Sequence, residues 1–381
     1  MRNKYILVNL FLVAAFLTGC AAPAGTMVNS PEPLVVSATR TPFLPANDTP
    51  TPTPALETST PTDTETSTPT LTGTSTPSLR VNLEAVGDIM LARTIGDQVQ
   101  AQGPEIVFAG VQSVFNSADV LIGNLECAIT AGGEQQQKSY TFAAPPKTAQ
   151  ALGLAGFDIL SLANNHAMDY GNQGLVDTRN NLGLYGIASV GAGENATEAH
   201  APFILERNGL RLAFLAYVDV PNEFTGFDTH TWIATVNQPG VAWANLDQIK
   251  TDVAAAKLQA DVVVVFLHSG YEETIKVAAH QREEAIAAIN AGAALVVGSH
   301  PHILQGIERY HGGLIAYSLG NFVFDDNPGL TNITIILRVV LTPAGVQSYD
   351  WVPVLIENGL PRLATESEGP AIGTLVAPIN P

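Results

Sequence analysis

Two histidines separated by one proline leave the end of an apolar run in the second half of the chain. His300 and His302 lie in GSHPHILQ (298–305), directly after the apolar residues ALVV. Neutral imidazoles are common ligands of borderline transition metals, so the pair suggests a metal site. A single His-x-His motif is weak evidence, and the interpretation depends on whether other parts of the chain supply further ligands.

Four earlier apolar runs are also followed directly by polar side chains. These are Asp88 in GDIMLAR, Glu126 in GNLECAIT, Asn165 and His166 in LANNHAMDYG, and His268 in FLHSGYEE. In open α/β sheets, functional side chains gather outside the carboxyl ends of the strands. We therefore expect these groups to converge on one crevice with the two histidines of GSHPHILQ.

This set of donors has the chemistry of a two-metal site. Two cations about 3.5–4 Å apart need a bridging carboxylate to screen their repulsion, and Asp88 and Glu126 supply anionic oxygen. Three imidazoles and the amide oxygen of Asn165 suit a borderline metal better than Ca²⁺ or Mg²⁺, which prefer oxygen alone. The donors therefore predict one or two divalent transition metals, with Mn, Fe and Zn as the candidates.

Each candidate ligand also has an ordinary structural interpretation. Asp88 could cap a helix, and Glu126 could form an ion pair with Lys138. Asn165 could serve a turn, because Asn tolerates left-handed backbone conformations. His268 follows strongly apolar residues and could be a buried histidine with satisfied hydrogen bonds.

The elements that must position these groups alternate along the chain. Near-continuous apolar runs predict strands at 81–87, 119–125, 157–163, 261–267 and 293–298. Helical patterns lie between them at 105–117, 146–155, 172–184, 245–259 and 273–291. Such strands, separated by helices, indicate a sheet buried on both faces. After residue 303 shorter strands and turns predict a more antiparallel part, so the class is α/β with two layered sheets.

Two other segments have simple interpretations. Glu272 and Glu273 fall at the start of the helix expected at 273–291, where they are typical of solvated helix charges. The region 221–244 contains Gly and Pro and interrupts the α/β alternation. It could form a lid over the site, although an ordinary excursion of the chain is the simpler interpretation.

The first eighty residues predict export and tethering. A basic start and a mostly apolar run at 5–17 are typical of a signal peptide, and the run is short for a membrane span. The sequence LTGC ending at Cys20 resembles the lipobox of bacterial lipoproteins, with an ordinary signal peptide as the alternative. The Thr/Pro-rich segment 21–79 predicts a disordered tether. We expect a lipid-anchored, extracytoplasmic protein with a globular domain at 80–360 and a tail at 361–381.

Charge and cysteine content narrow the range of partners. The net charge of −18 argues against nucleic acid, because binding phosphates needs a basic surface. Tight binding of a long polyanion would need a local cation cluster or metal to offset the acidic field. With Cys20 assigned to the anchor, Cys127 has no partner for an intramolecular disulfide.

The order of the motifs resembles that of a known family. GD, NLE, NNH, H-x-G and G-x-HPH, followed by YSLGNFVFD (317–325), occur in the order seen in the bacterial capsule-synthesis CapA family, and KSYTFAAPP (138–146) is also similar. That family, involved in poly-γ-glutamate production, belongs to the calcineurin-like metallophosphoesterase superfamily. The resemblance covers roughly residues 82–328. It implies a layered α-β-β-α sandwich with mixed sheets and a role in capsule or poly-γ-glutamate synthesis or export, with synthase subunits and an anionic polymer as partners.

The resemblance also implies a role for each ligand position. Asp88 and His302 would bind the first metal, and Glu126 would bridge the two metals. The second metal would be held by Asn165, His268 and His300. One departure affects the first metal, because phosphoesterases carry Asp-x-His in the first motif and this chain has Met90 in place of the histidine.

Other positions would act around the metals. The resemblance makes His166 a general acid or a stabiliser of the transition state, and Arg93 could add a fixed positive charge. Lys138 and Tyr140 could contact substrate, or one face of their strand could simply pack. Asn321 could support the site through hydrogen bonds or serve a turn.

Three functions remain open from these residues. A metal-dependent hydrolase could attack a phosphoester or an amide carbonyl such as a γ-glutamyl bond. A non-catalytic assembly or polymer-handling subunit of a capsule synthase is the second, and the departure at Met90 fits it. A secreted phosphoesterase or nucleotidase is the third.

Overall fold

The computed structural model describes residues 79–223, 225–326 and 329–376. The predicted signal peptide, the lipidated Cys20 and the tether up to residue 78 lie outside these residues. Within the described ranges, no helix has both the length and the apolar character needed to cross a bilayer.

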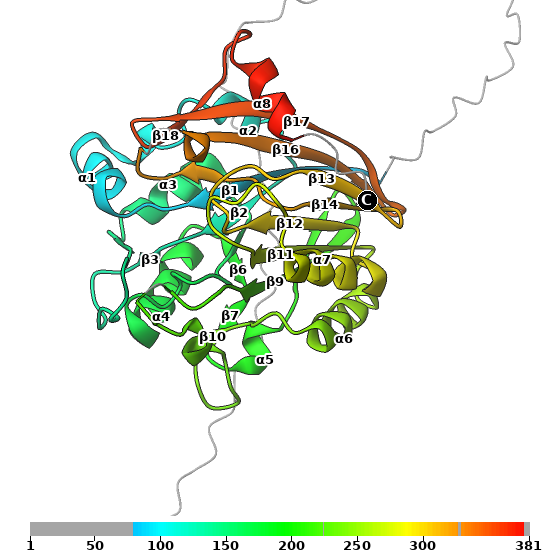
Figure 1. Cartoon of the computed structure of the whole chain (residues 1–381), viewed down its shortest axis with the longest axis horizontal. Helices are drawn as coiled ribbons and strands as arrows, with labels where there is room; N and C mark the ends of the chain where they lie inside the picture. The colour runs from blue at the N-terminus through cyan, green and yellow to red at the C-terminus, as the bar shows by residue number, and fades with distance from the viewer. Residues whose placement is uncertain (1–78, 224, 327–328, 377–381) are drawn as a thin grey trace, which may run out of the picture. The chain divides into compact units, whose positions relative to one another are not determined.

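The first large sheet has eight strands and is mixed (Figure 1). Its order is β18 (Leu360–Leu363), β17 (Gly345–Glu357), β16 (Ile333–Thr342), β1 (Val81–Ile89), β2 (Val120–Leu125), β5 (Ile159–Ser161) and β6 (Ala188–Val190), and β15 (Asn321–Val323) pairs with the end of β1. From β1 to β6 the strands are parallel. From β16 to β18 they are antiparallel, which confirms the predicted change after residue 303.

The second large sheet has six strands. Its order is β13 (Ile307–Tyr310), β14 (Gly313–Ala316), β12 (Leu295–Ser299), β11 (Val262–Ser269), β9 (Leu210–Asp219) and β8 (Phe203–Arg207). The four inner strands are parallel, and each edge strand is antiparallel to its neighbour. Small two-stranded pairs join β3 (Ala128–Ile129) to β4 (Ala143–Ala144) and β7 (Ala192–Gly193) to β10 (Gly240–Val241).

The apolar alternation of β11 explains the layers. Val262, Val264 and Phe266 join the core that also contains the buried residues of the first sheet. Val263, Val265 and Leu267 point the other way and pack with α6 (Leu246–Lys257) and α7 (Ala279–Ala291). A strand buried on both faces needs apolar residues at every position, which is what the run VVVVFL provides.

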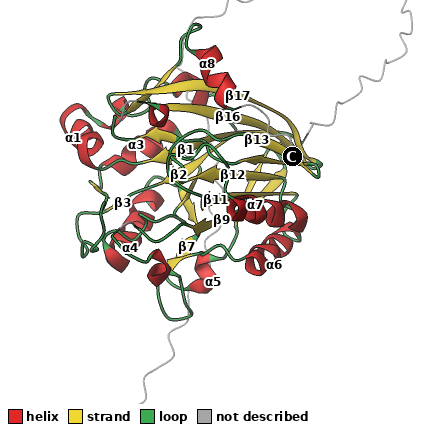
Figure 2. Ribbon diagram, viewed as in Figure 1, coloured by secondary structure: helices red, strands yellow, loops and turns green. Residues whose placement is uncertain are grey.

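Helices cover the opposite flank as well (Figure 2). The helices on the side of the first sheet are α1 (Arg93–Gln102), α2 (Gln112–Phe115), α3 (Thr148–Ala155) and α4 (Gly171–Gly183). The remaining helices are α5 (Ala196–Ala199), α8 (Gly369–Leu375), η1 (Pro104–Ile106), η2 (Thr229–Trp232) and η3 (Leu330–Asn332). The predicted α/β class with layered, mixed sheets is therefore confirmed.

Two boundaries differ from the sequence pattern. The fold continues past residue 360, because β18 pairs with β17 and Ile372 of α8 is buried. The helix expected from residue 273 begins instead at Ala279, where the Gln281 side chain accepts the N–H of Ala278 at 3.2 Å. Residues 270–278 therefore form a loop after β11, and this loop reaches the candidate site.

Candidate metal centre

The carboxyl ends of parallel strands bring the first polar groups together. Asp88 of β1 lies directly opposite Asn124 of β2 in the strand register. His268 of β11 lies opposite Ser299 of β12 in the second sheet. All four side chains are buried, so both sheets contribute polar groups to one interior cluster.

Asn124 links the two carboxylates of this cluster. Its Nδ2 donates to Asp88 Oδ1 at 2.8 Å and to Glu126 Oε2 at 3.4 Å. Its Oδ1 accepts from Asn164 Nδ2 at 3.0 Å, and the Oδ1 of Asn164 accepts the backbone N–H of His166 at 2.9 Å. The two amides thus fix the positions of the carboxylates and of the loop that follows β5. Both lie in the quoted NLE and NNH motifs, but their supporting role was not predicted.

His268 and Asn165 face each other with ligand-type atoms. His268 Nε2 lies 2.8 Å from Asn165 Oδ1, while His268 Nδ1 lies 2.9 Å from Ser299 Oγ. Burial holds the pKa of His268 well below its usual range, and the neighbouring His300 adds to this effect. The ring is therefore neutral, which is the form that binds metals. The hydrogen bonds satisfy a buried histidine and also hold it in a ligand orientation.

His300 gives the strongest indication of a metal site. The residue is 2% exposed, and neither Nδ1 nor Nε2 has a hydrogen-bond partner among the described residues. A buried polar group without a partner costs free energy, so such atoms in a native protein need an explanation. Its backbone φ of 94° is also unusual for a residue other than glycine. Burial lowers the pKa of this imidazole as well, so its nitrogens are free to coordinate.

His302 lies between the two carboxylates. Its Nδ1 is 2.8 Å from Asn321 Oδ1 and 3.4 Å from Asp88 Oδ2, and its Nε2 is 3.6 Å from Glu126 Oε1. Burial opposes protonation of this ring, but the charges of Glu126 and Asp88 outweigh it and raise the pKa of His302 to about 10. Burial raises the pKa of Glu126 well above its usual range, and Asp88 raises it further. Without a cation, protons must offset the carboxylate charge here.

His166 is oriented by the carboxylate of Asp169, three residues further along the chain. Its Nδ1 lies 2.7 Å from Asp169 Oδ2, and its Nε2 points toward Glu126, 4.0 Å from Oε1. The Phe142 ring stacks on the imidazole with 4.2 Å between centroids. Burial lowers the pKa of His166, although Asp169 partly opposes this. The ring therefore presents Nε2 to the cluster.

Lys138 lies beneath this part of the site and is enclosed. Its side chain is fully buried, and its Nζ contacts Asp169 Oδ1 at 2.8 Å and Glu223 Oε1 at 3.1 Å. It also donates to the backbone oxygen of Asn165, and it lies 4.9 Å from the centroid of the Trp232 ring. Among the described residues, Lys138 forms ion pairs with Asp169 and Glu223. It does not form the ion pair with Glu126 that the sequence left open. Lys138 holds the Asn165 loop against the 221–244 region.

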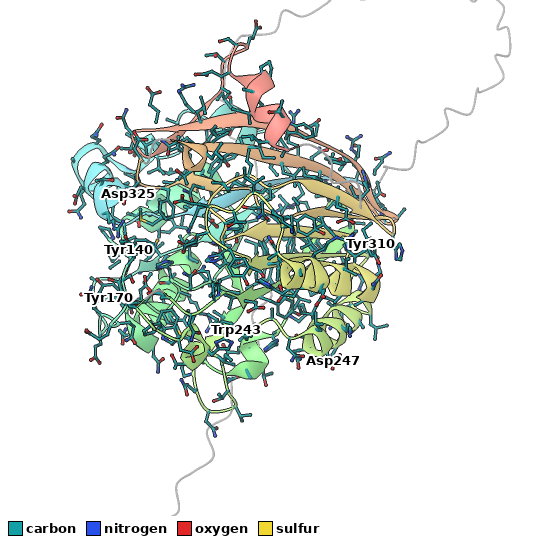
Figure 3. The ribbon with its side chains drawn as sticks, viewed as in Figure 1. Tyr140, Tyr170, Trp243, Asp247, Tyr310 and Asp325 are labelled. Atoms are coloured by element: carbon teal, nitrogen blue, oxygen red, sulfur yellow. The ribbon has the colours of Figure 1, made fainter. Side chains whose placement is uncertain are left out.

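Arg93 and Tyr140 lie at the rim. The Arg93 side chain is 39% exposed and pairs with Asp325 at 2.9 Å. Its guanidinium carbon lies 4.6 Å from the Phe142 ring and 5.5 Å from the Tyr140 ring. Tyr140 is 64% exposed, and it lies on the same flank as Asp325 in Figure 3. Arg93 thus approaches His166 through Phe142.

The six predicted ligand positions come together, and one further donor joins them. Two groups of side chains have ligand atoms within 4.8 Å of one another: Asp88, Glu126 and His268 in one, and Glu272, His300 and His302 in the other. Asn165 contacts the first group through His268. Glu272 was expected to be a solvated helix charge, but it lies in the 270–278 loop. One indication in the sequence that Glu272 could lie near the site is its position four residues after His268.

Met90 does not supply a donor to this cluster. The side chain is buried, and its sulfur accepts the backbone N–H of Ala92 at 3.2 Å. The strand end that carries Asp88 therefore contributes one ligand-type side chain. The remaining donors are carboxylate, amide and imidazole groups, a set that fits a divalent metal.

Comparison with known proteins identifies the family of the chain. The family described as "Bacterial capsule synthesis protein PGA_cap" matches residues 82–326. The chain belongs to this family. It is 34% identical over 296 residues to "Capsule biosynthesis protein CapA" of Bacillus anthracis, covering 76% of this chain and 70% of that protein. It is also 34% identical over 279 residues to "PGA biosynthesis protein CapA" of Bacillus subtilis (strain 168), covering 72% of each chain.

Among solved structures, the chain is similar to a 5'-nucleotidase from Candida albicans SC5314. The superposition has a TM-score of 0.43 at 11% sequence identity, and it covers 77% of this chain and 56% of the nucleotidase.

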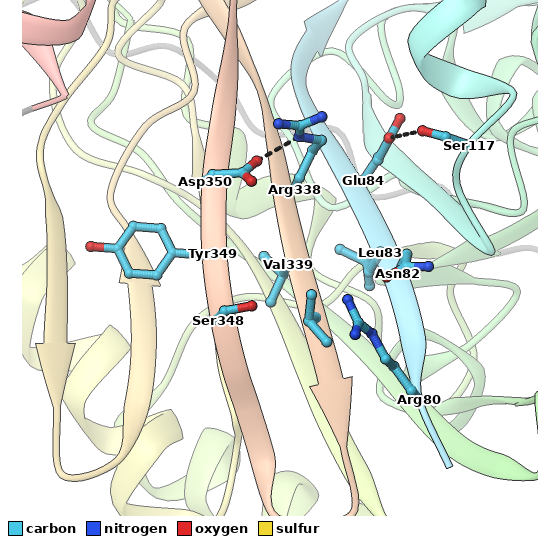
Figure 4. Close-up of a pocket in the computed structure, with 11 residues that line it drawn as sticks. Arg80, Asn82, Leu83, Glu84, Ser117, Arg338, Val339, Ser348, Tyr349 and Asp350 are labelled. Carbon is cyan, nitrogen blue, oxygen red and sulfur yellow. Dashed lines mark hydrogen bonds and ion pairs between the residues drawn. The ribbon is translucent and has the colours of Figure 1, made fainter. Parts of the chain in front are cut away.

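A separate pocket of about 240 Å³ lies over β1, β16 and β17 (Figure 4). Glu84, Arg338 and Asp350 form a row across the three strands there. Glu84 is 2% exposed; its Oε1 accepts from Ser117 Oγ at 3.1 Å, and its buried Oε2 has no partner in the described part of the chain. Burial raises the pKa of Glu84 to about 7. Arg338 is turned toward Asp350.

Proposed function

We propose that the protein acts in the synthesis or export of a capsule polymer such as poly-γ-glutamate, through a metal-dependent hydrolytic site. Membership of the PGA_cap family supports the pathway. The observation that carries the site is His300: its two buried ring nitrogens have no partner among the described residues, and ligand-type atoms of Glu272 and His302 lie within 4.8 Å of one of them. Such a cluster would be costly to bury unless a cation completed it.

The donors divide into ligands and supports. Asp88, Glu126, Asn165, His268, His300 and His302 would hold one or two divalent ions, with Mn, Fe and Zn as candidates. Such ions would supply Lewis acidity and an activated water. Ser299 fixes the His268 ring from behind, and Asn321 does the same for His302, as is usual for residues behind metal ligands.

His166 is placed to move a proton. Asp169 accepts from its Nδ1, so the neutral ring carries its free lone pair at Nε2 and the protonated ring donates from Nε2. Because Nε2 faces the Glu126 side of the cluster, this ring can exchange a proton with a substrate held there. Arg93 adds positive charge at the rim, where an anionic substrate would enter.

Metal reconstitution tests the site directly. Purified protein should bind a transition metal, as measured by elemental analysis after dialysis against Mn²⁺, Fe²⁺ or Zn²⁺. His300→Ala and His268→Ala should each reduce the bound metal, whereas substitution of the exposed His311 by Ala should not. Wild-type protein that binds no transition metal, or variants that bind as much as wild type, would refute the metal centre.

Hydrolysis assays test the reaction. Phosphomonoesters, phosphodiesters and γ-glutamyl peptides should be screened with added Mn²⁺. His166→Ala should lower the rate by about 10²–10⁴-fold, the usual contribution of a general acid or base, while metal content stays at the wild-type level. Turnover confined to phosphoesters, without a capsule defect on deletion, would instead indicate a secreted phosphoesterase or nucleotidase.

A non-catalytic subunit of a capsule synthase is the second candidate. The observation that favours it is Met90, which replaces an expected imidazole and turns its sulfur back to Ala92. This candidate expects bound metal or polymer but no turnover of any substrate above. A capsule defect in the deletion strain, rescued equally by wild type and His166→Ala, would establish it.

We also propose that Cys20 carries a lipid that holds the domain outside the cell membrane, near synthase subunits and the anionic polymer. The proposal rests on the LTGC sequence and the Thr/Pro-rich segment 21–79. Cys20→Ser should move the protein from the membrane fraction to the soluble fraction. Unchanged membrane association of this variant would contradict lipid anchoring.

A further inference from the structure

We propose that Glu272 is an additional metal ligand, supplied by the loop between β11 and α7 at the mouth of the centre. This inference rests on the proposed metal site and adds a residue to it. The position belongs to neither the first motif nor the HPH motif, and the sequence pattern placed it on a solvated helix.

The geometry joins Glu272 to two histidines. A carboxylate oxygen of Glu272 and ring nitrogens of His300 and His302 all lie within 4.8 Å of one another. Ligand atoms up to 4.8 Å apart leave room for an ion between them. The His300 nitrogens are buried and have no partner among the described residues. Glu272 is exposed, so the trio connects the buried cluster to solvent.

The loop is held in this place by hydrogen bonds of the two residues that follow Glu272. The N–H of Glu273 donates to the backbone oxygen of Pro301 at 2.9 Å, within the HPH turn itself. Gln305 Nε2 donates to the backbone oxygen of Thr274 at 2.7 Å. Gly270 has a φ of 114°, a conformation that lets the chain turn sharply after β11. Glu272 is therefore positioned by a backbone hydrogen bond to the turn that carries His300 and His302, and by a side-chain hydrogen bond from Gln305.

A third carboxylate, that of Glu272, would improve the charge balance of a site that holds two divalent ions. Two divalent ions bring four positive charges, and Asp88 and Glu126 offset only two of them. Met90 adds neither charge nor a ligand at the first strand end. A carboxylate at the mouth lowers the remaining positive charge, and being solvent-exposed it can be displaced by an incoming anionic group. Carboxylate oxygen also shifts an imidazole-rich site toward Mn²⁺.

The neighbouring residue provides a matched control. Glu272→Gln keeps the size of the side chain and removes its charge, and Glu273→Gln does the same at an adjacent exposed position. Full-length protein should be titrated with Mn²⁺ by calorimetry, with elemental analysis for stoichiometry. Glu272→Gln should bind Mn²⁺ at least about 10-fold more weakly, at the lower end of what residues around metals contribute. Glu273→Gln should match wild type. With Co²⁺, only Glu272→Gln should change the visible spectrum.

His300→Ala separates this inference from the proposed centre. If Glu272→Gln binds like wild type while His300→Ala loses metal, Glu272 is no ligand and the centre stands. Equal weakening by Glu272→Gln and Glu273→Gln would also overturn the inference, because it would reflect only general charge. If His300→Ala binds like wild type, both the centre and the role of Glu272 are refuted.

Discussion

Glu126 and Glu84 are two buried glutamates that share one feature, a carboxylate oxygen unpaired within the described ranges, but differ in the residues around them. Each has one carboxylate oxygen buried without a partner among the described residues, and burial raises the pKa of each. Around Glu126, imidazoles of His166 and His302 lie within 4.0 Å. Around Glu84, the contact is Ser117, and the nearby Arg338 is turned to Asp350.

The difference lies in how many elements deliver donors. The cluster at Glu126 receives side chains from both sheets and from the loops after β5, β11 and β12, whereas the row at Glu84 crosses neighbouring strands of one sheet. A buried, unpaired carboxylate oxygen is therefore a weak sign of a metal site. Convergence of imidazoles from separate strand ends is the stronger sign.

The sharpest test of this contrast is the same substitution at both positions. Glu126→Gln should weaken metal binding by more than the roughly 100-fold upper range of residues behind the ligands, because it removes the proposed bridging charge. Glu84→Gln should leave metal affinity unchanged. Titration of both variants with Mn²⁺ measures the effect. A similar loss in both would show that the two glutamates do not differ as described.

A smaller effect is expected behind His302. Asn321→Ala removes the 2.8 Å hydrogen bond to His302 Nδ1, so the ring loses its fixed orientation. Metal affinity should fall by about 10–100-fold, as is typical for residues that orient a ligand. Asn290→Ala, at an exposed position beside His311, is the control. Wild-type affinity in Asn321→Ala would mean that Asn321 serves only its turn.

The smallest effect is expected at Glu84 and concerns folding stability. The folded state holds the pKa of Glu84 near 7, whereas the ordinary value is 4.5, so the unfolded chain releases this proton at lower pH. The free energy of unfolding should therefore fall as the pH rises from 4.5 through 7, by about 1–2 kcal/mol for this group after allowance for solvent screening. Glu84→Gln should lose this component, and the exposed Glu105→Gln should keep it. Urea unfolding of metal-free protein across this pH range provides the measurement, and identical profiles would contradict it.

Strand ends could be predicted from the sequence because the apolar pattern of each strand is local. Near-continuous apolar runs predict β1, β2, β11 and β12, and parallel pairing brings the ends of neighbouring strands to one edge of the sheet. The pairing of Asp88 with Asn124 depends in addition on a register shift between Ala85 and Asp88, which the sequence does not indicate. Glu272 could not be predicted in the same way, since its place depends on where α7 begins. That start is set at Ala278 and Gln281, and a helical pattern continues upstream of both.

The burial of Lys138 was also beyond the sequence. Its partner Asp169 is 31 residues away in the sequence, and its other partner Glu223 lies in a still more distant segment. The Trp232 ring packs over the Lys138 ammonium group. The alternating Lys-x-Tyr-x-Phe pattern predicts which side chains share one face of a strand. It does not predict which other segments pack on that face. Asn321 likewise acquires its role only when β15 pairs with the end of β1.

The HPH turn has a thermodynamic consequence. His300 and His302 both hold positive φ values, 94° and 58°, on either side of Pro301. Conformations of this kind cost on the order of 1–3 kcal/mol each for residues other than glycine. An ion that binds only this conformation of the turn would offset that cost by mass action. The fraction of molecules with this conformation would therefore increase with the metal concentration. The folded state would then become more stable as the concentration of the ion rises. At low ion concentration, the turn around Pro301 would be the first part of the chain to lose its fixed conformation.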